Sequence, residues 1–590
     1  MTPAVRPRAE SGLDWPIFGL VGAMAAGGVL WGGGVLSAVL SGHAVPHGHP
    51  LGGLTAFAHV DDPSSGWGVP VGPWELYWTT TTVVVAMVSA MAWAGWRLLH
   101  GASRASEDPT RVEGLADRRQ VSAIAGTKAL LARASTLRPS LDHTTPAQVG
   151  YFLGRSRGVG CWASVEDSIV VVGPPRSGKG FNLVIPAILD APGAVITTST
   201  RADNLATTMS ARSKIGKVAV FDPQGLAAGV SSSLRWSPIR GCERPQTAMI
   251  RAWALCADAG QGTESGSFWR QQTITSVRCL LHAAALGTRS PAELYRWSLN
   301  PAAAKEAVDL LVDSPGAAPA WDRALDAIIA ADPRQRDSVW AMVANAFSSL
   351  ADPHVLAAVS PEPQQGFDPV SFLRDRGTLY LLGTASGASA TASLVAAFVE
   401  DVVEVARRLA AASPGARLDP PLGLILDEAA NYPLPSLGAL MSEGGGTGIT
   451  TMTVLQSLAQ ARDRWGRETA GAIWDSAIVK LVLPGSSNAD DLTDISRLLG
   501  DRTVVEYTET SEAGGGKAVS ASKRERPVLD PATIRTLGPG HALLLLRSAK
   551  PIMLSLQPWT TRPDAEQIRD ALTQLEESFR AAASQGLGNG

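Results

Sequence analysis

Cysteine is scarce in this sequence. The 590 residues include four cysteines, Cys161, Cys242, Cys256 and Cys279, and none of them forms a Cys-x-x-Cys pair. This spacing argues against a disulfide framework and against a cysteine metal site. We therefore expect four small, buried, apolar side chains in a reducing compartment.

The sequence also lacks an excess of either charge. Lys and Arg total 51, Asp and Glu total 54, and the formal net charge is −3. This balance excludes a chain-wide basic surface, so any surface for nucleic acid must be local. With 45% hydrophobic residues, the chain is long enough to bury two or three cores.

Charge is missing altogether from two segments near the N-terminus, residues 16–41 and 76–96. A helix of about 20 residues crosses the hydrocarbon core of a membrane, so both segments are predicted to be transmembrane helices. Residues 42–75 between them contain no Lys or Arg, whereas arginines precede the first segment and follow the second. The positive-inside rule then predicts that both termini are cytoplasmic. The run Gly32-Gly33-Gly34 is suited to close helix packing and to oligomer contacts within the membrane.

The strongest local pattern is a glycine-bounded loop between an apolar strand, 169–172, and a helical stretch, 181–189. The loop fits G-x-x-x-x-G-K, in which backbone N–H groups and the helix N-terminus cradle phosphates while the lysine, Lys179, reaches the β- and γ-phosphates. A plain βα turn is the alternative interpretation. The predicted nucleotide-binding residues are Gly173, Pro174, Pro175, Arg176, Ser177, Gly178, Lys179, Gly180 and Phe181.

Gly180 stands where a P-loop usually has the Ser or Thr that binds Mg²⁺. The metal must then be held by water, by a neighbouring hydroxyl such as that of Ser177, or by a second acidic motif. Such a motif occurs at the end of the apolar run 421–426, where Asp427 and Glu428 follow in sequence.

In P-loop ATPases the first carboxylate holds Mg²⁺ through water and the second polarises the attacking water. These roles are predicted for Asp427 and Glu428, and a helix N-cap pair is the alternative. A third strand, 450–455, is followed by Gln456, which is placed to sense the γ-phosphate unless it merely caps a helix. Lys179, Glu428 and Gln456 are the predicted catalytic residues.

The pattern along the chain predicts an α/β fold, a RecA-like P-loop NTPase with a parallel sheet, because strands alternate with helices. Helical periodicity without strands predicts an all-α domain inserted within it. The predicted parts are a membrane domain (1–99), a juxtamembrane connector (100–148), a nucleotide-binding domain in two parts (149–240 and 368–560), the inserted domain (241–367), and a C-terminal surface helix with its tail (561–590). Residues 121–134 are predicted to form one amphipathic helix in the connector. The polar, basic stretch 513–526 is interpreted either as a nucleic-acid contact or as a solvated hairpin loop.

The sequence resembles the coupling-protein ATPases of type IV secretion and conjugation, the TraG/TraD family. The resemblance covers about residues 150–500 and the two N-terminal spans. In that family glycine commonly follows the P-loop lysine, as Gly180 does here. The matching blocks are Gly173–Gly180 with Val184-Ile-Pro186 and Pro192-Gly193, Phe221-Asp-Pro223 with Trp236-Ser-Pro238, Leu426-Asp-Glu-Ala429, Gly448-Ile449 and Leu455-Gln-Ser457.

The resemblance implies a homo-hexameric ATPase anchored in the bacterial inner (plasma) membrane by two spans. It implies ATP and Mg²⁺ as cofactors and ATP hydrolysis stimulated by DNA. The implied partners are DNA, with a single strand favoured, a relaxase bound to that strand, and the components of the secretion channel.

The chain departs from the family at two points. Arg201 stands near the position where the family often has a lysine, and it is predicted to replace that lysine. Gly444-Gly445-Gly446 stands where many members carry the arginine that acts on the neighbouring subunit, and Arg462 or Arg464 is the candidate replacement.

Four aromatic residues of the inserted domain are interpreted either as a base-stacking surface or as core: Trp253, Phe268, Trp269 and Trp297.

Two other functions compete with this hypothesis. A double-stranded DNA translocase of the FtsK type is expected to carry a C-terminal winged-helix reader, and the residues after 560 are too few for one. A membrane adaptor that binds ATP structurally and recruits protein cargo is the other alternative. The paired Asp427 and Glu428 argue against it, whereas Gly180 and the missing arginine argue for it.

Overall fold

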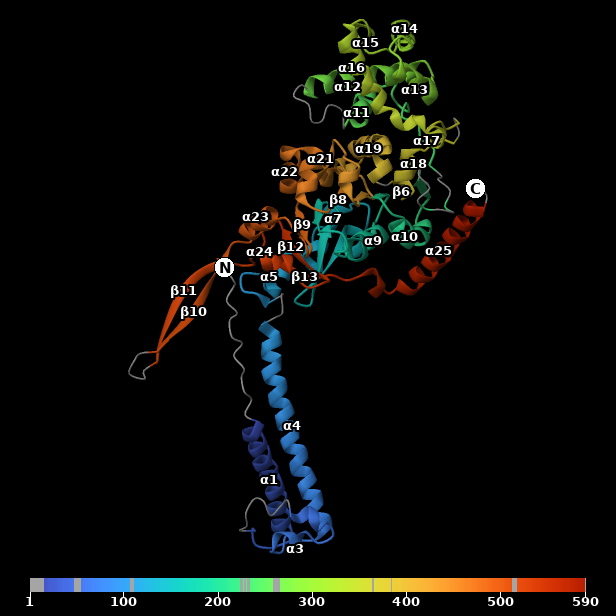
Figure 1. Cartoon of the computed structure of the whole chain (residues 1–590). Coiled ribbons are helices and arrows are strands. Elements are labelled where there is room, and N and C mark those ends of the chain that lie inside the picture. Colours follow the sequence, from blue (N-terminus) through green and yellow to red (C-terminus); the bar gives the residue numbers. More distant parts are fainter. Residues whose placement is uncertain are drawn as a thin grey trace, which may run out of the picture. The chain divides into compact units, whose positions relative to one another are not determined.

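The computed structural model describes residues 15–46, 55–106, 111–222, 227, 230, 234–257, 266–362, 365–383, 385–511 and 517–588. The chain divides into two compact units, Met1–Arg111 and Val112–Gly590 (Figure 1). The first is helical, and the second contains the sheet that carries the predicted site.

Two helices dominate the first unit, α1 (Trp15–Leu40) and α4 (Trp74–Ser106). They pack closely at Gly33, whose carbonyl accepts a 3.1 Å hydrogen bond from Oγ1 of Thr80. A Cβ atom at Gly33 would lie 2.4 Å from Oγ1 of Thr81, so no larger residue fits there. The predicted close packing at the glycine run is therefore confirmed as a contact within the chain, and the oligomer contact stays a prediction.

One helix among the described residues, Trp74–Gly95 of α4, is long and apolar enough to cross a membrane. The other predicted span coincides with α1, whose side chains are described from Gly27 onward, and Gly27–Leu40 is a shorter apolar stretch. Between the two helices, the short helices η1 (Ala56–Ala58) and α3 (Pro63–Trp67) pack into a small core with Tyr77.

The second unit is built on an eleven-stranded sheet in the order β2-β1-β13-β12-β9-β3-β8-β7-β4-β6-β5. The strands from β9 to β5 in this order are all parallel, and β12, β13, β1 and β2 add an antiparallel edge. The strand bounds are β1 (Gly150–Ser156), β2 (Val159–Ser164), β3 (Ile169–Val172), β4 (Val195–Ser199), β5 (Val218–Phe221), β6 (Thr378–Leu382), β7 (Leu422–Leu426), β8 (Ile449–Leu455), β9 (Val479–Val482), β12 (His541–Leu546) and β13 (Ile552–Ser555).

Helices cover both faces of this sheet, which explains why its strands are continuous apolar runs. In β3, Val170 and Val172 belong to one core, whereas Ile169 and Val171 belong to the other. The helices beside the parallel strands are α9 (Ile185–Asp190), α10 (Asp203–Ser213), α19 (Ala385–Ala411), α20 (Leu437–Glu443), α21 (Leu458–Trp465), α22 (Arg467–Ser476), α23 (Ala489–Leu499) and α25 (Ala565–Gly588). This arrangement confirms the predicted parallel sheet wound with helices.

Between β5 and β6 the described residues form helices and no strand, as the periodicity predicted (Figure 1). These helices are α11 (Pro245–Leu255), α12 (Gly266–Leu286), α13 (Pro291–Leu299), α14 (Lys305–Asp313), α15 (Trp321–Ile329), α16 (Pro333–Ala346), η4 (Ser348–Ala351), α17 (Pro353–Ala358) and α18 (Pro369–Arg374). We refer to them as the inserted helices.

One local prediction, a single helix in the connector, was wrong. Residues 121–134 form three short helices, α5 (Arg118–Ile124), α6 (Thr127–Leu131) and α7 (Ala134–Leu137), rather than one. Gly126 separates α5 from α6, because its backbone is extended, with φ −74° and ψ 160°. The stretch 513–526 falls largely within a long hairpin, β10 (Asp501–Ser511) and β11 (Lys517–Pro527), and residues 512–516 lie outside the described part. The edge strands β1, β2 and β13 were not predicted.

The four cysteines are buried, as predicted. Burial raises the pKa of the Cys161, Cys242, Cys256 and Cys279 thiols to about 12. These side chains therefore remain protonated thiols and act as packing groups.

Candidate nucleotide site

The predicted site residues meet at one edge of the sheet because the strands that carry them are neighbours. Strand β8 lies between β3 and β7, with Val172 beside Leu455 and Leu426 beside Thr453. All three strands are parallel, so their carboxyl ends open on the same side. The loop after β3, the acidic pair after β7 and Gln456 after β8 are thus brought together, as the sequence predicted.

The loop after β3 has the backbone that its glycines predict. Gly178 has φ +87°, and a Cβ atom there would lie 2.5 Å from Nδ2 of Asn182. Arg176 also has positive φ, at +64°. Residues 180–184 then form a π-helical turn that continues into α9, where a regular helix was predicted. The wider turn lets the Asn182 amide donate to the carbonyl of Gly178 at 2.8 Å, which fixes the end of the loop.

Lys179 lies inside this loop, with 8% of its surface exposed. Its Nζ donates to the carbonyl of Gly173 at 3.0 Å. Burial lowers the pKa of Lys179, and the nearby carboxylates of Asp427 and Glu428 oppose that shift. The ammonium group is therefore held close to the acidic pair without being exposed to solvent.

Two buried polar atoms at the site have no hydrogen-bond partner among the described residues. They are Oγ of Ser177 and Oδ1 of Asp427. Buried polar atoms are normally paired, so each is available to a ligand. A carboxylate oxygen is a ligand that Mg²⁺ prefers, and a hydroxyl can bind Mg²⁺ or donate a hydrogen bond to a phosphate oxygen. Ser177 and the acidic pair are two of the alternatives for replacing the hydroxyl missing at Gly180, and both stay predictions.

Asp427 is held by the neighbouring strand and helix. Its Oδ2 accepts a 3.1 Å hydrogen bond from the Asn204 amide, and its backbone carbonyl accepts a 2.8 Å hydrogen bond from Oγ1 of Thr198. Burial raises the pKa of the Asp427 carboxyl, and the adjacent Glu428 raises it further. A bound cation would offset this cost of ionisation.

Glu428 is held by three other side chains and by a strained backbone. Its Oε2 accepts hydrogen bonds from Oγ1 of Thr200 at 2.6 Å and from the Asn431 amide at 3.1 Å. Its Oε1 accepts from the Gln456 amide at 3.4 Å. Glu428 itself has φ +51°, an unusual value for a residue with a side chain and one that is often found at functional sites. Gln456 thus contacts the carboxylate that is predicted to activate water.

A cavity of about 730 Å³ opens in front of these residues. Its polar end contains Lys179, Thr200, Asp427 and Glu428. Its other end is lined by Phe181, Ile185, Trp559 and three residues of α25, Leu572, Glu576 and Phe579. Sequence reasoning identified the polar end but missed Thr200, Asn204 and Asn431, and it treated α25 only as a surface helix.

The structure shows the contacts of the residues at both departures from the family pattern. Arg201 lines the cavity, is largely exposed, and pairs with Asp203 at 3.3 Å. Gly445 packs against the loop after β2, where a Cβ atom would lie 1.9 Å from the carbonyl of Glu166. An arginine cannot replace Gly445 without moving that backbone. Of the candidate replacements, Arg462 pairs with Asp491 at 2.8 Å, and Arg464 is exposed.

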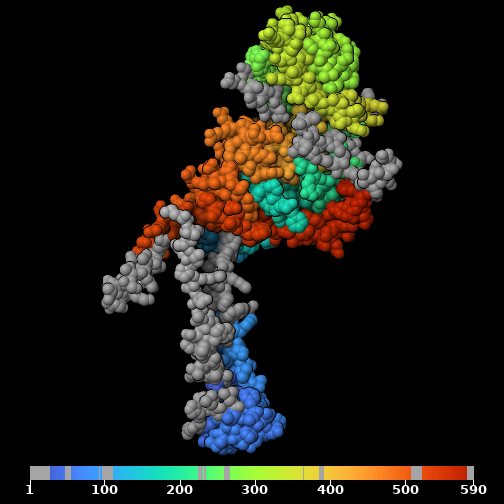
Figure 2. Space-filling view, viewed as in Figure 1, coloured from blue at the N-terminus to red at the C-terminus, as the bar shows by residue number. Residues whose placement is uncertain are grey.

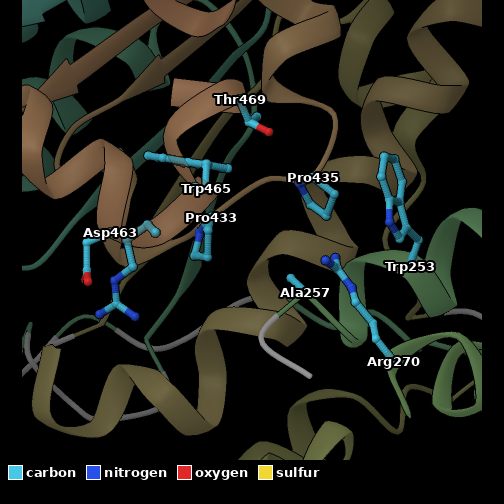
Figure 3. Close-up of a pocket in the computed structure, with 10 residues that line it drawn as sticks. Trp253, Ala257, Arg270, Pro433, Pro435, Asp463, Trp465 and Thr469 are labelled. Atoms are coloured by element: carbon cyan, nitrogen blue, oxygen red, sulfur yellow. The ribbon is translucent and has the colours of Figure 1, made fainter. Parts of the chain in front are cut away.

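Arg464 lines a second cavity, of about 670 Å³, between the inserted helices and the segments around Pro433 and Trp465 (Figure 3). Trp253 and Arg270 reach it from α11 and α12. Trp253 and Phe268 are exposed, Trp269 is half-buried, and Trp297 is fully buried with its Nε1 donating to Glu306 at 3.2 Å. Trp297 is therefore a core residue, and base stacking remains a prediction for Trp253 and Phe268.

Comparison with known proteins agrees with the fold. A family model described as "Type IV secretory system Conjugative DNA transfer" matches residues 124–579. No curated protein sequence matches the chain.

Solved structures of the bacterial conjugative coupling protein TrwB have a similar fold. The unbound form is 19% identical with a TM-score of 0.52, covering 73% of this chain and 93% of that structure. TrwB with the non-hydrolysable ATP analogue ADPNP is 20% identical, with a TM-score of 0.52 and coverage of 75% and 95%. TrwB in complex with ADP and Mg²⁺ is 18% identical, with a TM-score of 0.51 and coverage of 73% and 93%. At this identity the likeness shows the RecA-like fold.

Proposed function

The chain belongs to the type IV secretory system conjugative DNA transfer family, and we propose that it is a membrane-anchored ATPase that moves DNA into a secretion or conjugation channel. The observation that carries the proposal is the convergence of Lys179 and the Asp427–Glu428 pair at one cavity, with Gln456 in contact with Glu428. Such a convergence is what ATP hydrolysis requires, because phosphoryl transfer depends on positioning and on charge stabilisation.

The cofactors we propose are ATP and Mg²⁺. The loop from Gly173 to Phe181 would hold the phosphates, and Lys179 would stabilise their charge. Asp427 would hold Mg²⁺, through water, with the free Oγ of Ser177 nearby in the loop. Bound there, Mg²⁺ would neutralise charge on the transferred phosphoryl group. The TrwB complexes with ADPNP and with ADP and Mg²⁺ support this assignment.

Glu428 is the residue that we propose orients and activates the attacking water. Its carboxylate is fixed by Thr200, Asn431 and Gln456, which leaves it little freedom to turn. Gln456 would respond to loss of the γ-phosphate through its contact with Glu428. We propose for Lys179, Glu428 and Gln456 the catalytic roles that the sequence predicted.

We propose that α1 and α4 both span the inner membrane and that both termini are cytoplasmic. The apolar stretch Trp74–Gly95 and the distribution of arginines support this topology. A homo-hexameric ring that receives a relaxase-bound single strand is the proposed working form, by analogy with the family.

One observation favours a second function, that of an adaptor which binds ATP without turning it over. Gly444-Gly445-Gly446 stands where many family members carry an arginine, and Gly445 lies too close to Glu166 for a side chain. Gly180 removes the usual hydroxyl ligand as well. The adaptor would keep nucleotide binding and lose hydrolysis.

A conjugation assay separates the two functions. Lys179→Ala and Glu428→Gln should each abolish DNA transfer, whereas Lys128→Ala, at an exposed lysine outside the site, should leave transfer unchanged. If Lys179→Ala and Glu428→Gln both transferred DNA normally, the motor function would be wrong and the adaptor would be the better account.

A further inference from the structure

We propose that the C-terminal segment of the chain, Trp559 together with α25, is part of the nucleotide site and forms the wall that receives the base. This inference rests on the proposed ATP site and adds residues that lie about 380 positions after the P-loop (559 − 179 = 380). Figure 2 shows the C-terminal segment, in red, against the teal region of the chain that includes the P-loop.

The cavity has two chemically different ends. Lys179, Asp427 and Glu428 make one end charged, which suits the phosphates. Phe181, Ile185, Trp559, Leu572 and Phe579 make most of the other end apolar and aromatic, and Glu576 is the charged residue beside them. A nucleoside triphosphate also has two different ends, because its phosphates are charged and its base is flat and aromatic. The apolar end is therefore the place for the base.

Phe181 provides the stacking face. It follows the P-loop directly and keeps 43% of its surface exposed while lining the cavity. Its ring meets the Trp559 ring edge to face, with centroids 5.9 Å apart and an interplanar angle of 71°. No base fits between two rings in that contact. Trp559, which is 6% exposed, instead packs against the Phe181 ring and limits the orientations that this ring can adopt.

Helix α25 provides another part of the wall. Leu572, Glu576 and Phe579 have the spacing i, i+4, i+7, so they lie on one face of the helix, and all three line the cavity. Leu572 also packs with Ile185, and Phe579 packs beside Leu205 of α10.

An ion pair anchors this segment to the P-loop helix. Nη1 of Arg562 contacts Oδ2 of Asp190, the last residue of α9, at 2.8 Å. Nε of Arg562 also pairs with Asp564 at 2.9 Å, just before α25 begins. The wall is therefore fixed to the helix that starts at the phosphate loop.

The test compares ligands with and without a base, using calorimetric titration of the full chain in detergent. The ligands are ADP with Mg²⁺, GDP with Mg²⁺, and inorganic tripolyphosphate. Phe181→Ala should weaken ADP and GDP binding about tenfold, as the loss of one stacking contact does. Tripolyphosphate affinity should not change, because it lacks the base. Phe181→Tyr should restore nucleotide binding.

Two further variants test the supporting residues. Phe579→Ala should weaken ADP binding severalfold without affecting tripolyphosphate, and Gln574→Ala, at an exposed position of α25 that does not line the cavity, should change neither. Trp559→Phe should retain binding, since the smaller ring still supports Phe181.

The result that overturns the inference is equal loss of ADP and tripolyphosphate affinity, or no loss of either, in Phe181→Ala. Binding of ADP by a chain that does not hydrolyse ATP would contradict only the motor function. A wild-type chain that bound neither ADP nor tripolyphosphate would contradict the proposed site and this inference together.

Discussion

The hydroxyl of Thr200 donates a 2.6 Å hydrogen bond to Oε2 of Glu428, which joins the end of β4 to the end of β7 across the site. Thr200→Val keeps the shape of the side chain and removes this donor. We expect kcat for ATP hydrolysis to fall roughly tenfold, because the general base loses one of its orienting contacts. ADP affinity should stay unchanged. Thr200→Ser should restore kcat, and an equal loss in Thr200→Ser would show that the hydroxyl is not what matters.

A hydroxyl can be returned to position 180. A Cβ atom on Gly180 would meet nothing within 4 Å, and its backbone φ is not positive, so Gly180→Ser should fold normally. The new hydroxyl adds a metal ligand, and we expect the Mg²⁺ concentration for half-maximal hydrolysis to fall severalfold. A Mg²⁺ titration of the initial rate measures this.

The control for that change is Gly178→Ser in the same loop. Gly178 has φ +87°, and a Cβ atom there would clash with Asn182, so this variant should lose nucleotide binding. An unchanged Mg²⁺ requirement in Gly180→Ser would mean that position 180 does not face the metal.

The buried carboxyl group of Asp427, which is needed for the proposed ATP hydrolysis, is expected to lower the free energy of unfolding at neutral pH. Burial raises its pKa in the folded protein above the ordinary value for aspartate, about 3.9. The folded state therefore binds the proton of Asp427 more tightly than the unfolded state does. The resulting contribution to the free energy of unfolding is fully present below the unfolded pKa and is lost as the pH rises through the folded pKa. At neutral pH, Asp427→Asn should stabilise the chain by about 1 kcal/mol while abolishing hydrolysis.

Thermal melts at neutral and acidic pH, without nucleotide or Mg²⁺, measure this effect. The difference in Tm between wild type and Asp427→Asn should shrink as the pH is lowered. A lower Tm for Asp427→Asn at neutral pH would show that the ionised carboxylate is well compensated in the empty site.

A buried ion pair connects the inserted helices to the sheet domain. Nη2 of Arg251, on α11, lies 2.8 Å from Oδ1 of Asp401, on α19, and both side chains are nearly inaccessible. Arg251→Met would leave Asp401 poorly compensated, and we expect a loss of about 3 kcal/mol in the free energy of unfolding. Arg240→Met removes the more exposed partner of Asp401 and should cost less. Chemical denaturation compares the two, and equal losses would contradict the importance of burial.

The sequence allowed the parallel strands to be predicted because they are buried on both faces. Continuous apolar runs such as Ile169–Val172 are visible without any tertiary information. The edge strand β1 was missed because its sequence mixes Arg155 and two glycines with apolar residues, and because its pairing with β13 depends on residues about 400 positions away. Gly126 could have signalled the break in the predicted connector helix.

Much of the polar end of the site was predictable because each motif lies next to its own strand. Lys179, Asp427 and Glu428 follow strands that the apolar pattern reveals. Thr200 and Asn204 were not predicted, since a threonine and an asparagine after a strand are common and only the neighbouring strand order places them near the acidic pair. The wall from α25 was missed because its amphipathic pattern shows that one face is buried but does not show against what.

The central claim, that this chain is a DNA-stimulated motor, is tested most directly by ATP hydrolysis of the purified full chain with and without single-stranded DNA, beside Lys179→Ala. We predict turnover that rises with DNA and disappears in Lys179→Ala. Nucleotide binding with no turnover under any DNA would contradict the motor and support the adaptor, with Gly444–Gly446 marking a lost arginine.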